Sequence, residues 1–108
     1  MRLRRGEIWW VALDPTIGSE IAKTRPCVVI SNSAANDRRK TVMVVPFSTS
    51  PKAYPPFTVP VRCQGRDVSA IIDQTRAVAK ERFQGYIEVC SARDLAGIED
   101  ALRPLLQL

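Results

Sequence analysis

Short apolar stretches, separated by polar segments with Pro and Gly, run along most of the chain, a pattern typical of a β-rich fold. Glu7 to Leu13 is aromatic and β-branched, so it predicts a strand that stops at the turn signal Asp14-Pro15. Pro26 to Ser31 is almost wholly apolar and predicts a strand buried on both faces, and Thr41 to Phe47 predicts a third strand. The polar segments 16–25 and 32–40 are predicted as a loop and as a helical turn or loop.

Shorter strands continue the pattern in the second half of the chain. Three prolines make 48–56 a loop, and Phe57 to Arg62 then predicts an edge strand, where Pro60 is tolerated. A turn at 64–67 and two further short strands complete this part, with the strands at 68–72 and 75–79.

One amphipathic helix is predicted near the C-terminal end. Ser91 to Asp94 resembles a capping box, with Asp in place of the usual Glu, and Pro104 is expected to end or kink the helix. Apolar residues at helical spacing form its buried stripe: Leu95, Ile98, Leu102 and Leu105. A run of strands followed by one helix favours a mainly β (α+β) fold, in which short antiparallel strands form a bent, partly open barrel against the helix.

The composition indicates an ordinary globular domain. At 108 residues and 45% hydrophobic, the chain is expected to form a single domain, 1–108. No apolar run approaches the ~20 residues of a membrane span, and the start lacks a signal-peptide pattern, so we expect no membrane and a cytoplasmic location. The three cysteines form no C-x-x-C pair, and Cys27 and Cys90 are expected to be small buried hydrophobes.

Charge adds a first functional indication. The net charge is +5, with 14 Lys/Arg against 7 Asp/Glu up to Ile87 and 2 against 4 from Glu88 onward. A basic body with a slightly acidic tail fits a polyanion partner, and it equally fits a surface kept for solubility. The run Arg38-Arg39-Lys40 is interpreted as a solvated corner.

Three polar clusters lie at the ends of predicted strands, where loops present functional side chains. They are Gly18-Ser19-Glu20 with Thr24-Arg25-Pro26, then Pro46-Phe47-Ser48-Thr49-Ser50, then Asp73-Gln74. Each has a structural alternative: Arg25 closing a salt bridge with Glu20, hydroxyls capping a turn, and Asp73-Gln74 joining two strands. Lys23 and Lys52 lie in the first two loops and suit phosphate contacts.

In their order and spacing, these segments resemble the MazF/PemK/Kid family of toxin endoribonucleases. The matching segments are Arg5-Gly6-Glu7-Ile8-Trp9, Asp14-Pro15-Thr16 with Gly18-Ser19-Glu20, Arg25-Pro26 before Val28-Val29-Ile30, Val45-Pro46-Phe47-Ser48, and Asp73-Gln74 before Arg76. The resemblance covers nearly the whole chain and implies an SH3-like, partly open barrel that forms a homodimer. It also implies cleavage of single-stranded RNA at short sequences, and inhibition by a MazE-like antitoxin with an acidic, disordered tail.

The resemblance also implies roles for individual residues. Arg25 and Ser48 fall on the family's catalytic arginine and hydroxyl positions, and Glu20 falls on an acidic position that has been considered as a base. RNA contacts are implied at Ser19, Lys23, Thr49, Lys52, Asp73 and Gln74. Two residues depart from the family pattern: Ser48 stands where threonine is usual, and Ile21 stands where glutamine is common. The second departure leaves the sequence preference of the first loop open.

The residue types present suit cleavage through the RNA 2′-OH without a metal or other cofactor. The chain has no histidine, and its acids are scattered singly instead of clustered for paired magnesium ions. We therefore expect Arg25 to clamp the scissile phosphate and Ser48 to donate a hydrogen bond to it or to the leaving oxygen, with Glu20 as base. The expected products carry a 2′,3′-cyclic phosphate and a 5′-hydroxyl.

Two other functions remain open at the level of sequence. The CcdB gyrase poisons share this fold class without cutting RNA, and a non-catalytic barrel of this shape would only bind nucleic acid. The combination of Arg25-Pro26 with Ser48 favours the ribonuclease, because a gyrase binder does not need it.

Overall fold

The computed structural model describes residues 2–49 and 53–108. Its strands are β1 (Glu7–Ala12), β2 (Thr24–Val29), β3 (Thr41–Ser48), β4 (Thr58–Cys63), β5 (Arg66–Ile71), β6 (Arg76–Ala79) and β7 (Phe83–Val89). Its helices are α1 (Ser33–Arg38) and α2 (Ala92–Leu106), with 3₁₀ turns η1 (Ile72–Gln74) and η2 (Lys80–Arg82).

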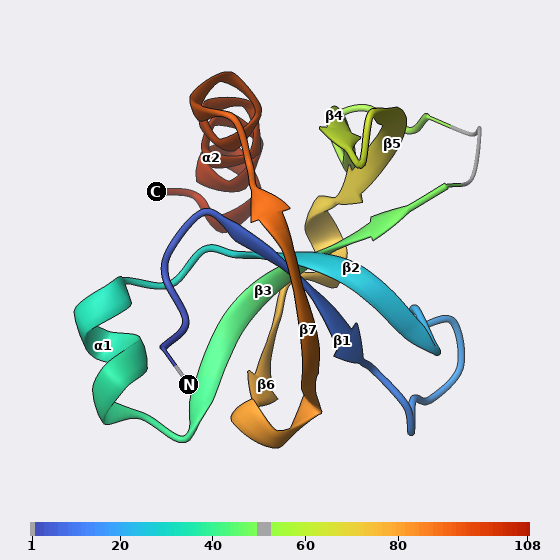
Figure 1. Cartoon of the computed structure of the whole chain (residues 1–108). Coiled ribbons are helices and arrows are strands. Elements are labelled where there is room, and N and C mark those ends of the chain that lie inside the picture. The colour runs from blue at the N-terminus through green and yellow to red at the C-terminus, as the bar shows by residue number, and fades with distance from the viewer. Residues whose placement is uncertain (1, 50–52) are drawn as a thin grey trace.

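The strands form one strongly bent sheet. Every pairing within the described residues is antiparallel, in the order β4-β5-β3-β2-β1-β7, and β6 pairs with β3 in addition. Figure 1 shows the sheet curling into a half-barrel, with α2 beside its β4–β5 part. The predicted fold class, a partly open antiparallel barrel with a C-terminal helix, is confirmed.

Two apolar clusters hold the sheet together from its opposite faces. Val28 and Val45, which face each other across β2 and β3, belong to the cluster under α2. Their neighbours Cys27, Val29 and Val44 belong to the second cluster, with Phe83 of β7. β2 is therefore buried on both faces, as its continuous apolar run predicts.

α2 covers the first cluster with the predicted stripe. Ile98 is fully buried, and Leu95 and Leu102 pack beside it, whereas Leu105 is 39% exposed and lies outside the stripe. Ser91 caps the helix by accepting a 3.1 Å hydrogen bond from the Asp94 N–H. Within the described residues, no helix combines the length and apolar character that crossing a membrane requires.

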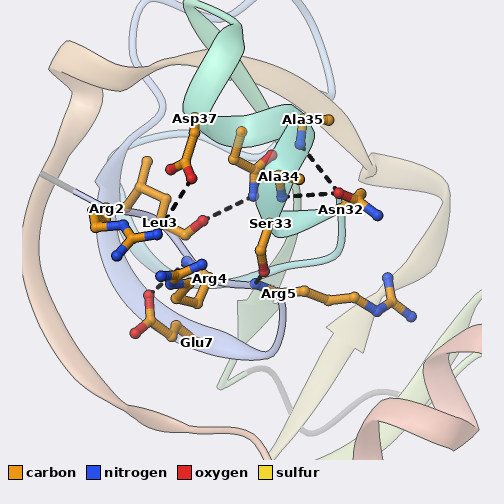
Figure 2. Close-up of polar contacts among 11 residues, drawn as sticks. Arg2, Leu3, Arg4, Arg5, Glu7, Asn32, Ser33, Ala34, Ala35 and Asp37 are labelled. Carbon is orange, nitrogen blue, oxygen red and sulfur yellow. Dashed lines mark hydrogen bonds and ion pairs between the residues drawn. The ribbon is translucent and has the colours of Figure 1, made fainter.

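The chain start is fastened to α1. Asn36, the buried polar residue of α1, donates to the Leu3 carbonyl at 3.0 Å and to the Ser31 carbonyl at 3.2 Å. The Arg5 N–H donates to Ser33 Oγ at 2.9 Å, and Figure 2 shows this segment lying against the helix. These bonds explain why a segment with few apolar residues is ordered at the edge of the barrel.

The structure differs from the prediction in one missed strand, one side-chain contact and two element boundaries. β7 was not predicted, because Gly85 interrupts its apolar pattern. The Asp94 carboxylate does not close a capping box; it accepts the Arg62 N–H of edge strand β4 at 2.9 Å. α2 continues past Pro104 to Leu106, so Pro104 does not end it. The segment 16–25 is not a loop throughout, since β2 begins at Thr24.

Candidate functional site

The candidate site lies where β2 and β3 separate. The two strands are paired from Val29 and Val44 as far as Cys27 and Pro46. Arg25 and Ser48 each lie two residues beyond this last pair, Arg25 on β2 and Ser48 at the end of β3. Beyond the pair, β2 stays with β1, whereas β3 turns to β5 (Figure 1). The sheet therefore opens between the two predicted catalytic residues.

Arg25 is held in place through only part of its guanidinium group. Arg25 lies on β2 opposite Val11 of β1, and its side chain is half-buried. Its Nε donates to the Ala22 carbonyl at 3.1 Å. Its two terminal nitrogens bind no described residue, and Arg25 forms no ion pair with Glu20 or with any other described acid. The structural alternative, a salt bridge between Arg25 and Glu20, is therefore not formed, and no described residue binds the anion-binding edge of the guanidinium.

A second arginine lies near the same point. Arg76 on β6 faces Val44 of β3, and its Nη1 donates to the Leu13 carbonyl at 3.4 Å. Burial raises the pKa of the Cys27 thiol to about 12, against an opposing effect of the nearby positive charges of Arg76 and Arg25. Both guanidinium groups thus lie close to Cys27. Arg76 was seen in the sequence only as part of a motif, and no role was predicted for it.

The first loop is fixed by bonds within itself and to η1. Glu20 Oε1 accepts the Ile17 N–H at 2.6 Å, so the carboxylate faces its own loop. Gln74 Oε1 accepts the Ile21 N–H at 3.3 Å, which ties this loop to η1. The alternative expected from the sequence was a link between two strands, whereas this bond of Gln74 joins the first loop to η1. Lys23, two residues before Arg25, has a positive φ of 69° and is exposed.

A hollow of about 440 Å³ brings together three of the predicted RNA-binding residues. Ser19, Asp73 and Gln74 line it with the exposed rings of Tyr54 and Phe57. The remaining lining residues are Thr58 and Ile71, which face each other across β4 and β5. Neither ring was predicted to be functional, because Tyr54 falls in the proline-rich segment predicted as a loop and Phe57 falls in a predicted strand. Large rings exposed beside polar groups are the signal that identifies them.

Of the other predicted residues, Thr49 follows β3 and is exposed, and Lys52 lies outside the described residues. A larger hollow, of about 690 Å³, lies between β4, β7 and the start of α2, and no predicted site residue lines it. In the described part of the chain, no group of three His, Cys, Asp or Glu side chains is placed to hold a metal ion. Burial raises the pKa of Cys90 to about 11, so this thiol and Cys27 stay protonated near neutral pH.

Comparison of this chain with known proteins identifies a family to which its sequence is similar. A family model described as PemK-like, MazF-like toxin of type II toxin-antitoxin system matches residues 4–106. The endoribonuclease MazF9 of Mycobacterium tuberculosis is 38% identical, over 98% of this chain and 98% of its own length.

Solved structures share the fold. The crystal structure of MazF from Deinococcus radiodurans has a TM-score of 0.90 at 24% identity, covering 100% of this chain and 99% of that one. An endoribonuclease from a mycobacterial species, solved in complex with its cognate antitoxin, has a TM-score of 0.80 at 20% identity, over 97% and 95% of the two chains.

Proposed function

This chain belongs to the family of PemK-like, MazF-like toxins of type II toxin-antitoxin systems and is an endoribonuclease, and we propose that it cuts single-stranded RNA with Arg25 and Ser48. The observation that carries this proposal is that a half-buried guanidinium, whose two terminal nitrogens bind no described residue, and a strand-end hydroxyl lie on the two strands that separate where the sheet opens. The family resemblance noted in the sequence is confirmed.

In the proposed reaction, the RNA 2′-OH attacks the adjacent phosphorus and the bond from phosphorus to the 5′-oxygen breaks. The pentacoordinate transition state carries extra negative charge on its equatorial oxygens. Arg25 is suited to bind two of these oxygens, because its guanidinium stays charged at any working pH and donates through parallel N–H groups. Ser48 donates a hydrogen bond to the phosphate or to the leaving 5′-oxygen and keeps its proton, and the leaving oxygen takes its proton from water. The products carry a 2′,3′-cyclic phosphate and a 5′-hydroxyl.

The proposed base for the 2′-OH is Glu20, which must first release the Ile17 N–H. We expect Glu20→Gln to slow cleavage by about tenfold, below the usual contribution of a general base, because water can replace the exposed carboxylate. The glutamine oxygen can still accept the Ile17 N–H, so the loop keeps its shape. The measurement is the rate of cleavage against pH. An unchanged rate and an unchanged pH profile would remove Glu20 from the mechanism.

The hollow beside η1 is proposed as the place where an unstacked base is selected. Tyr54 is 59% exposed and Phe57 is 45% exposed, so each ring has a face available for stacking. Ser19, Asp73 and Gln74 supply hydrogen-bonding groups at the same place. Base stacking on an aromatic side chain contributes about 1–3 kcal/mol. Lys23, Thr49 and Lys52 are proposed to contact the phosphate backbone.

The double variant Tyr54→Ala/Phe57→Ala is expected to raise KM for RNA about tenfold and to broaden the set of cleaved sequences, with kcat little changed. Sequencing the ends of the products measures the second effect. Tyr86→Ala is the matched control, because Tyr86 is 51% exposed on β7, outside the lining of the hollow. An unchanged cleavage pattern in the double variant, or an equal change in the control, would contradict base selection in this hollow.

Two partners complete the proposal. An antitoxin of the MazE type, with an acidic tail that folds on binding, fits the +5 net charge of this chain, and a mycobacterial relative is solved with its cognate antitoxin. A homodimer is proposed from the family, and two exposed leucines, Leu106 at the end of α2 and Leu108 just beyond the helix, offer apolar surface for it. The proposed compartment is the cytoplasm, where RNA substrates occur and where the free, buried thiols of Cys27, Cys63 and Cys90 remain reduced.

A further inference from the structure

A group of basic side chains gathers at the end of β3 that is opposite to Ser48. Arg38 is the last residue of α1, Arg39 and Lys40 connect α1 to β3, and Lys80 begins η2. The Lys80 N–H donates to the Lys40 carbonyl at 3.1 Å, which joins the two segments. Figure 1 shows the connection and η2 at the same end of the molecule. We name these four residues the basic corner.

The charges of the basic corner are not used by the fold. Arg38, Arg39 and Lys40 are exposed and Lys80 is half-buried. Among the described residues, none of the four side chains takes part in an ion pair or a hydrogen bond. The neighbouring acid Asp37 pairs with Arg2 at 3.5 Å instead. Glu81, next to Lys80 on η2, is the acid nearest in the chain that takes part in no ion pair among the described residues, so the corner keeps a net positive charge that favours an anionic partner.

We propose that the basic corner is a second binding site for the phosphate backbone of single-stranded RNA, outside the sequence that is cut. β3 runs from Thr41 beside the corner to Ser48 at the candidate site, a distance of about 23 Å at about 3.3 Å per residue. A few nucleotides of extended strand cover that distance. The proposal deepens the ribonuclease function and rests on it for the identity of the polyanion.

An acidic peptide is the competing partner, and the surface favours RNA. A peptide that folds on binding must bury apolar side chains to offset its loss of entropy. Neither of the two hollows described above is lined by a residue of the basic corner. A phosphate backbone needs only cations at the spacing of its charges, and Arg and Lys supply them without a pocket.

The test is binding of RNA to a variant of the corner. The variant is Arg38→Gln/Arg39→Gln/Lys40→Gln, and the matched control is Arg66→Gln/Arg93→Gln/Arg103→Gln. All six side chains are exposed and none takes part in an ion pair among the described residues, so the two variants lose equal charge. The probes are 2′-O-methyl oligonucleotides, which cannot be cut through the 2′-OH. A short probe fits the candidate site alone, and a long probe extends past both ends of β3.

The corner variant is expected to bind the long probe about tenfold more weakly than wild type. The slope of the logarithm of its binding constant against the logarithm of salt concentration is expected to be shallower by about 2, from about 0.7 for each of the three lost contacts. Its affinity for the short probe should stay unchanged, as should both affinities of the control. Arg38→Lys/Arg39→Lys should bind like wild type, because phosphate contacts here require charge and no fixed geometry.

Three results would overturn the proposal. Equal weakening by the corner and control variants would mean that only overall charge matters. Weakening on the short probe would place the corner within the site of cleavage. Unchanged RNA binding with lost binding of polyglutamate would assign the corner to an acidic peptide. Because the probes are not cut, none of these results depends on catalysis, and failure of the proposed Arg25–Ser48 chemistry would appear separately as absent cleavage of unmodified RNA.

Discussion

Arg25→Ala is expected to lower the rate of RNA cleavage by about 1,000-fold, the upper end of what one lost donor to a transition-state oxyanion costs. Both terminal nitrogens of Arg25 are unbound by described residues, whereas Nη1 of the nearby Arg76 is already bonded to the Leu13 carbonyl, so Arg76 can replace at most part of the two phosphate contacts. The measurement is the single-turnover rate on a long single-stranded RNA. KM should change much less than kcat if the clamp acts on the transition state.

Two further variants make this result interpretable. Arg25→Lys keeps the charge and loses the parallel pair of donors, so we expect a rate between those of wild type and Arg25→Ala. Arg66→Ala removes an exposed arginine from β5 and should leave the rate unchanged. The bond from Arg25 Nε to the Ala22 carbonyl is also lost in Arg25→Ala, so thermal unfolding must show that the variant is folded. A folded Arg25→Ala with near-wild-type activity would disprove the proposed clamp.

Ser48→Ala is expected to slow cleavage by about 100-fold, because a hydroxyl donor to the phosphate or to the leaving oxygen is removed. Ser48→Thr keeps the hydroxyl and should retain activity within a few-fold, and it restores the residue usual in this family. Ser69→Ala is the matched control, because Ser69 lies directly across from Ser48 on β5. Equal losses in Ser48→Ala and Ser69→Ala would indicate a disturbed strand pair instead of a missing donor.

The sequence predicts the barrel well because its signals are local. β1, β3 and the start of α2 follow from apolar runs, turn residues and a capping serine, each within a few neighbouring positions. β7 is harder, since Gly85 and the polar residues around it give no clear alternation. It is ordered by pairing with β1, a contact between the two ends of the chain that no local pattern contains.

The candidate site is predicted only in part, because its geometry depends on where two strands separate. The residue types of Arg25 and Ser48 are visible in the sequence, whereas their position two residues beyond the last β2–β3 pair follows from the turn of β3 toward β5. The position of Arg76 near Cys27 depends on how distant segments fold together and was not predicted. The bond from Ile21 to Gln74 likewise joins residues far apart in the chain.

The family assignment settles what the sequence alone left open. The gyrase-poison and non-catalytic binding alternatives rested on the fold class alone, and proteins of one fold class can have many functions. The matching family model and the relative MazF9 support the endoribonuclease. The residue roles remain predictions, and they are what the variants of Arg25, Ser48 and Glu20 measure.

The most direct test of the account is cleavage of a long single-stranded RNA by the wild-type protein in EDTA, with analysis of the ends produced. We expect cleavage at a few defined short sequences, undiminished by EDTA, leaving 2′,3′-cyclic phosphate and 5′-hydroxyl ends. Cleavage that is lost in EDTA and restored by magnesium, or products with 5′-phosphate ends, would contradict the arginine-based mechanism.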